Sequence, residues 1–99
     1  MLLQTRVGVV AFSGDASIAF HLNEFTTTLS VLNVLRLRHL GGYTNTQQAL
    51  NLMHTSMFTA ANGDRDGVPN VGLLISDGNS NVVPENTIPE GEAARGKAI

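Results

Sequence analysis

Two runs of the chain are apolar at nearly every position. Residues 7–12 are Val-Gly-Val-Val-Ala-Phe, and residues 71–75 are Val-Gly-Leu-Leu-Ile. A strand with one face in water alternates apolar and polar residues, whereas a strand covered on both faces is apolar throughout. The two runs therefore predict buried, interior parallel strands at 6–12 and 71–75.

The pattern changes directly after the first run. Residues 13–16 are Ser-Gly-Asp-Ala, which favour a turn, and in residues 17–22 larger apolar side chains alternate with small or polar ones. Alternation of this kind is typical of a strand with one face exposed. Residues 6–22 therefore predict a β-hairpin whose second strand lies at a sheet edge.

Helical spacing follows in two segments. Leucines recur every third position over 29–35, after threonines that can cap a helix, and Gly41-Gly42 is placed to end it. Over 46–62 apolar residues recur three and four positions apart, which predicts a second helix. We expect Thr46 to be its N-cap and Gly63 to close it in a left-handed conformation.

Residues 90–98 are rich in Glu, Ala, Arg and Lys, which favours a third helix. Covered strands, a hairpin and intervening helices describe an α/β, doubly wound (Rossmann-like) sheet in a single domain over 1–99. In that architecture ligands bind beyond the carboxyl ends of the strands. Ser13, Asp77 and the loop before the second helix should therefore gather at one rim.

Composition narrows the classes of function. The chain has 99 residues, 42% of them hydrophobic and 14% charged, which allows one small globular core. A net charge of −2 with scattered Lys and Arg gives no basic stripe, so no nucleic-acid partner is expected. The absence of cysteine removes thiolate chemistry and leaves the compartment open. No stretch is long enough to span a bilayer, and the start lacks the pattern of a secretory signal.

The candidate chemistry rests on hydroxyl and carboxylate oxygens. Asp77 follows the second apolar run, and Thr44 and Thr46 stand just before the 46–62 helix. Each also has an ordinary structural role open to it, as a turn aspartate or a helix N-cap. Oxygen ligands without sulfur or histidine suit Mg²⁺ or Mn²⁺ and disfavour zinc.

The remaining polar residues do not suggest an enzyme. Ser13 and Ser76 have no base that the sequence identifies, so nucleophilic catalysis is not expected. His21, His39 and His54 lack the spacing of metal ligands and are expected at surface or edge positions.

At these motifs the chain resembles the von Willebrand factor type A (VWA) domain. The resemblance rests on residues 6–13, 20–23, 41–46 and 74–78, with further agreement at 65–69 and 93–95. It implies an extracellular protein-binding module of the matrilin and collagen type, which binds a matrix component such as collagen through Mg²⁺ or Mn²⁺. By match of motif, Thr44 corresponds to the threonine of the family's metal-ion-dependent adhesion site, and Asp77 to its second aspartate.

The resemblance is incomplete at both ends. The family's first central strand and its Asp-x-Ser-x-Ser loop precede the 6–13 strand, and two more strands follow the last helix. Residues 15–19 read Asp-Ala-Ser-Ile-Ala and imitate part of that loop, but they fall in the hairpin turn. We therefore expect a partial domain that holds no cation tightly, has marginal stability and self-associates through open sheet edges.

Two alternatives remain open. A small nucleotide- or phosphate-binding α/β domain or enzyme would use the same rim, although the sequence has neither a Gly-x-Gly-x-x-Gly nor a Gly-Lys-Ser/Thr loop. A truncated product without independent function is the other.

Overall fold

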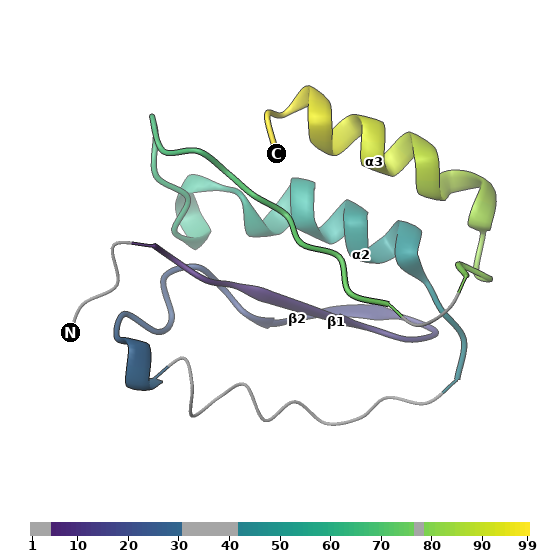
Figure 1. The fold of residues 1–99 in the computed structure, drawn as a ribbon, viewed down its shortest axis with the longest axis horizontal. Coiled ribbons are helices and arrows are strands. Elements are labelled where there is room, and N and C mark those ends of the chain that lie inside the picture. Colours follow the sequence, from purple (N-terminus) through teal and green to yellow (C-terminus); the bar gives the residue numbers. More distant parts are fainter. Residues whose placement is uncertain (1–4, 31–41, 77–78) are drawn as a thin grey trace.

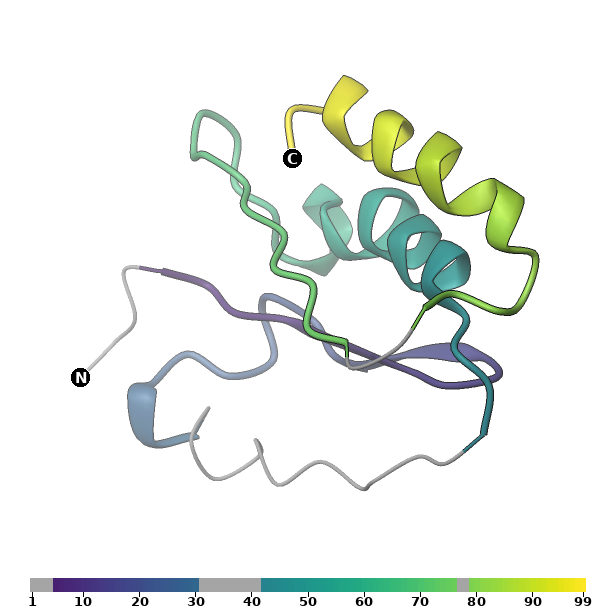
Figure 2. The same ribbon diagram turned by 45° about the vertical axis from the view of Figure 1, so that its right-hand side comes forward.

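The computed structural model describes residues 5–30, 42–76 and 79–99. Its elements are β1 (Val9–Phe12), β2 (Ala16–Phe20), α2 (Thr46–Leu52), a π-helical turn η1 (Met53–Met57), short 3₁₀ helices η2 (Ala60–Asn62) and η3 (Pro84–Asn86), and α3 (Thr87–Gly96). The hairpin, α2 and α3 form successive layers, with α2 in the middle (Figures 1 and 2). Most of the helix predicted from residue 29 lies outside the described residues.

The predicted hairpin is confirmed. β1 and β2 pair antiparallel, with Phe12 opposite Ala16 and Val10 opposite Ile18. The register shifts between Val9 and Val10, because Val9 pairs with Phe20 and leaves Ala19 as an extra residue on β2. Such a bulge bends the strand and increases its twist.

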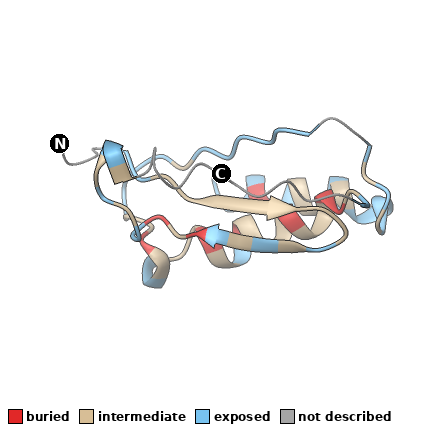
Figure 3. Cartoon of the chain, turned by 90° about the horizontal axis from the view of Figure 1, so that it is seen from below, coloured by how far each residue is buried: buried red, intermediate tan, exposed pale blue. Residues whose placement is uncertain are grey.

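The prediction of two interior parallel strands is wrong for the described part of the chain. Within it, β1 pairs only with β2 and its side chains are half-buried. Residues 71–76 are extended but pair with no strand there, and all of them are exposed (Figure 3). An apolar run shows that a segment suits a covered strand. The run does not show that another strand lies beside the segment and covers it.

The small core lies between the hairpin and the helices. Its buried apolar residues come from each of these layers and are Phe20, Leu22, Ala49, Met57 and Ala94. The rings of Phe20 and Phe25 meet edge to face with centroids 5.3 Å apart, an arrangement that aromatic pairs prefer. The aliphatic and methionine content of the core agrees with the few aromatics in the sequence.

The helix predicted over 46–62 is confirmed, with changes of geometry along it. The α-helix gives way to the π-helical turn at Met53, and η2 ends at Gly63. Gly63 has φ +103° and donates its N–H to the carbonyl of Ala60, as predicted for a left-handed cap. The last helix begins at Thr87, three residues before its predicted start at Glu90.

Methionines of η1 rest directly on glycines of neighbouring segments. A Cβ atom added to Gly8 would lie 2.3 Å from Sδ of Met57, and one added to Gly72 would lie 2.5 Å from Sδ of Met53. Because Met53 and Met57 are one helical turn apart, the same face of η1 covers both the start of the hairpin and the 71–76 segment. Among the described helices, none has the length and apolar character of a membrane span.

Candidate functional site

The β1–β2 turn meets the segment just before α2. The Asn45 N–H donates to the carbonyl of Ser13 over 2.7 Å, and the Asn45 side-chain amide donates to the carbonyl of Gly14 over 2.9 Å. Ser13 and the loop before α2 therefore lie together, as the predicted sheet architecture requires.

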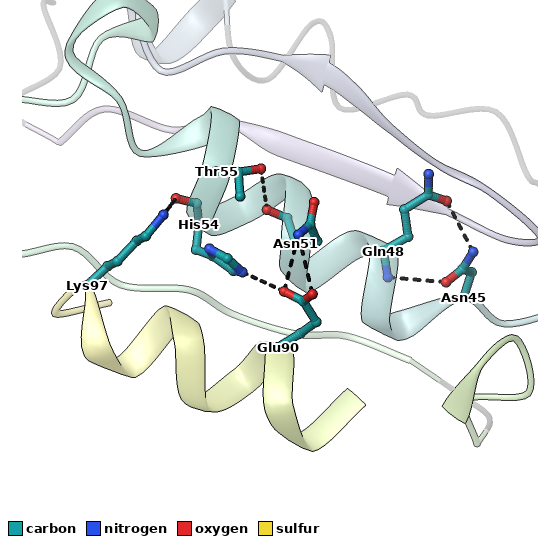
Figure 4. A network of polar contacts seen from close by, with 7 residues as sticks. All are labelled: Asn45, Gln48, Asn51, His54, Thr55, Glu90 and Lys97. Atoms are coloured by element: carbon teal, nitrogen blue, oxygen red, sulfur yellow. Dashed lines mark hydrogen bonds and ion pairs between the residues drawn. The ribbon is translucent and has the colours of Figure 1, made fainter. Parts of the chain in front are cut away.

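Asn45 rather than Thr46 is the N-cap of α2. Its side-chain oxygen accepts from the N–H of Gln48 at 3.2 Å, and Thr46 is the first helical residue. The side-chain oxygen of Gln48 in turn accepts from the N–H of Ala16 at 2.8 Å. It also accepts from the Asn45 side-chain amide at 3.1 Å (Figure 4). Both Asn and Thr are good caps. Asn is suited to this position because its amide can also donate to the turn of the hairpin.

Replacing Asn45 with alanine should lower the free energy of unfolding by about 2 kcal/mol, since a cap and a buried donor are lost together. Asn45 is 4% exposed, so water can replace its bonds only in part. Urea unfolding followed by circular dichroism measures the loss. Asn45→Asp keeps the cap but not the donor and should fall between Asn45→Ala and the parent. An Asn45→Ala variant as stable as the parent would contradict this role.

Thr44 is fixed by the loop that follows Asp77 in the sequence. The N–H of Thr44 donates to the side-chain oxygen of Asn81 at 2.6 Å, and the N–H of Asn81 donates to the Thr44 carbonyl at 2.9 Å. The Ser80 hydroxyl also donates to that carbonyl, at 3.4 Å. This one loop thus binds both the N–H and the carbonyl of the Thr44 main chain, and the Thr44 side-chain hydroxyl takes no part in these bonds. Asp77 itself lies outside the described residues.

The described residues alone do not form a cation site. A hard divalent cation takes several oxygen ligands, of which carboxylates are the strongest. Among residues 5–30, 42–76 and 79–99, no group of three or more His, Cys, Asp or Glu side chains could hold a metal ion. Asp15 and Ser17, which imitate the family's loop in sequence, are exposed on the turn and on β2. Of the predicted ligands, the described part of the chain contains only Thr44.

A second polar cluster joins α2 and η1 to α3, and the sequence did not reveal it. His54 and Glu90 form a hydrogen bond in which Nε2 of the imidazole donates to a carboxylate oxygen at 2.5 Å. The amide of Asn51 lies 3.3 Å from both Glu90 oxygens, and the Lys97 ammonium donates to the His54 carbonyl at 3.1 Å (Figure 4).

The expected surface position of His54 is wrong, because the residue is buried. Its location between Leu50 and Met57, on the apolar stripe of the helix, was an available signal of burial. The sequence pattern could not identify Glu90 as its partner, because the two residues are 36 positions apart. The remaining ring nitrogen, Nδ1, is buried without a partner in the described structure.

Comparisons with known proteins identify relatives of this chain. The family model described as von Willebrand factor type A domain matches residues 3–98. The collagen alpha-6(VI) chain of Mus musculus is 41% identical over 80 residues, which are 78% of this chain and 4% of that protein. Matrilin-1 of Gallus gallus is 36% identical over 78 residues, which are 78% of this chain and 16% of that protein. The chain thus spans a small part of the curated relatives it matches.

A solved structure shares the fold. It is proximal thread matrix protein 1 from the mussel byssus with a zinc-occupied MIDAS motif, where MIDAS denotes the metal-ion-dependent adhesion site. Its TM-score is 0.82 and its identity 26%, over 94% of this chain and 24% of that chain. Zinc in that protein shows that the preference of oxygen ligands for Mg²⁺ or Mn²⁺ does not exclude zinc from such a motif.

Proposed function

Because the chain belongs to the von Willebrand factor type A family, we propose that residues 1–99 are part of one extracellular adhesion domain that binds a matrix protein such as collagen. The relatives are matrix and adhesion proteins, among them a collagen chain and a matrilin. This supports a protein-binding module in place of an enzyme. None of the described residues of the site favours the nucleotide-binding alternative.

In the proposed site Thr44 and Asp77 are ligands of a divalent cation, Mg²⁺ or Mn²⁺ by the chemistry of their oxygens. When bound, the cation supplies an open coordination position for an acidic side chain of the partner protein. The observation that carries the proposal is the pair of hydrogen bonds between Thr44 and Asn81, which leave the Thr44 hydroxyl available. A threonine whose main chain is fixed in this way can offer that oxygen at little further cost in conformational entropy.

Titration of the chain with Mn²⁺, followed by paramagnetic broadening of amide resonances, tests the site. We expect broadening centred on residues 13–15, 43–45 and 79–81, with a Kd of about 10⁻³ M or weaker because few ligands are supplied. Asp77→Ala should abolish the local broadening, and Thr44→Val should weaken it.

Asp66→Ala is the matched control, because Asp66 is an exposed acidic residue in the 64–69 turn, and it should leave the broadening unchanged. Broadening that survives Asp77→Ala would reject the proposed ligands. In a separate assay, binding of the chain to a collagen-coated surface should be lost on addition of a chelator. Binding that persists there would reject the cation-dependent mechanism.

A further inference from the structure

Two chemically labile dipeptides, Asn62-Gly63 and Asp66-Gly67, lie close together after η1. An asparagine or aspartate followed by glycine can react with its own main chain, because glycine has no side chain to hinder its nitrogen. That nitrogen attacks the carbonyl carbon of the preceding side chain. In an unfolded chain the asparagine reacts faster, because an ionised carboxylate is a poorer electrophile than an amide. The structure places the two dipeptides in opposite environments.

The fold holds both reacting groups of Asn62-Gly63. The Asn62 side-chain amide donates to the carbonyl of Ser56 at 2.9 Å, and its main-chain N–H donates to the carbonyl of Thr59 at 3.0 Å. Gly63 is buried, and its N–H donates to the carbonyl of Ala60 at 3.2 Å. The side chain and the attacking nitrogen must leave these partners before they can meet. Reaction at this dipeptide therefore requires η2 to open locally.

Asp66-Gly67 is exposed at both residues. Apart from its chain neighbours, nothing lies within 4 Å of a Cβ atom added to Gly67, whose φ of +74° suits glycine at the third position of a β-turn. This turn is closed by the N–H of Val68, which donates to the carbonyl of Arg65 at 3.3 Å. In the described part of the chain, the Asp66 carboxylate and the Gly67 N–H have no hydrogen-bond partner. The two groups can therefore meet without local unfolding of a helix.

We propose that Asp66 is a site of spontaneous isoaspartate formation, and that the fold protects Asn62 from the faster form of the same chemistry. The Gly67 nitrogen bonds to Cγ of the protonated Asp66 carboxyl group. The C–OH bond breaks, and its hydroxyl leaves as water with the proton of the nitrogen. Water then opens the cyclic imide, and opening at the main-chain carbonyl leaves the chain linked through the Asp66 side chain. Water is released and consumed again, so no other reactant is needed.

The product changes the geometry of the turn and keeps its charge. Isoaspartate adds a methylene group to the main chain and retains a carboxylate. The hydrogen bond between Val68 and Arg65 would lose its spacing, because it spans the altered residue. The Asn70 side-chain amide also donates to Asp64 at 3.4 Å across the same turn. The modification would therefore alter the path of the chain from η2 to residues 70–76.

The variant Asp66→Asn tests the effect of the fold, because it places the same dipeptide at both positions. Cleavage after Glu24 and Glu85 releases both positions on one fragment, in which mass spectrometry with fragmentation assigns deamidation to each. In the folded variant, position 66 should deamidate at least about tenfold faster than Asn62, because only Asn62 requires local opening. In urea the two rates should agree within about threefold, since each is then set by the following glycine.

The natural chain gives the direct test of the product. Electron-transfer fragmentation, which distinguishes isoaspartate from aspartate, should find isoaspartate accumulating at Asp66 while Asn62 stays intact in the folded chain. Asp66→Glu is the matched control, because it keeps the charge and should remove the product at this position, since glutamate closes the larger imide ring far less readily. Equal rates at the two positions of folded Asp66→Asn, or loss of Asn62 ahead of Asp66 in the folded natural chain, would each overturn the proposal.

Discussion

Gly63→Ala is expected to lower the free energy of unfolding by about 3 kcal/mol or more, a large share of the stability of a small domain. Gly63 has φ +103°, a conformation that costs residues with a Cβ atom on the order of 1 kcal/mol. An added Cβ would also lie 2.7 Å from both the main-chain nitrogen and the Cβ of Asn23. Backbone cannot move aside as a flexible side chain can, so the clash adds to the strain.

The surroundings of Gly63 increase the effect. Its carbonyl accepts from the Arg6 guanidinium at 2.8 Å, and the Asn23 amide donates to the carbonyl of Ala61 at 3.4 Å. The end of η2 is therefore fixed to both ends of the hairpin. Displacing Asn23 would weaken these hydrogen bonds and would also disturb the packing of η2 against the hairpin.

Other glycines separate strain from close approach. Gly67 also has a positive φ, +74°, but nothing lies within 4 Å of an added Cβ, so Gly67→Ala should cost about 1 kcal/mol. Gly91 lies inside α3 with open space around it, so Gly91→Ala should stabilise by about 0.5–1 kcal/mol. Urea unfolding followed by circular dichroism compares the three variants. Equal costs for Gly63→Ala and Gly67→Ala would show that contact with Asn23 contributes nothing.

The sequence predicted the elements that depend on local patterns. Alternation over 17–22 predicted β2, helical spacing predicted α2 and η1, and Gly63 predicted the cap at their end. In each case the determining physical preference lies within a few neighbouring residues. The resemblance to the VWA family was likewise confirmed, because several ordered motifs carry it together.

The failures concern residues whose state depends on a distant partner. An apolar run at 71–75 predicted burial, but burial needs a covering strand that the pattern itself does not contain. Thr46 and Asn45 are both capping residues, and contacts with the hairpin turn decide between them. For the candidate site, the sequence named Thr44 by resemblance, but it could not predict that Asn81 would hold its main chain.

The second large effect on the free energy of unfolding is expected at the polar cluster around His54. Glu90→Ala should lower the free energy of unfolding by about 2–3 kcal/mol, since a buried donor loses its acceptor. The His54 imidazole is buried, and the Glu90 carboxylate is its only partner at Nε2 among the described residues. Asn51 loses the same acceptor. Glu90 also lies in the first turn of α3, where a negative charge interacts favourably with the helix dipole.

Two further variants identify which property of Glu90 matters. Glu92→Ala removes an exposed carboxylate from the same helix, and its effect should stay within about 0.5 kcal/mol. Glu90→Gln keeps an acceptor for His54 but loses the charge, so it should cost about 1 kcal/mol. Thermal and urea unfolding of the three variants, with amide exchange of α3, measure these differences. If Glu90→Ala matched Glu92→Ala, α3 would be held to α2 by apolar contacts such as Ala94 alone, and the polar cluster would contribute no stability.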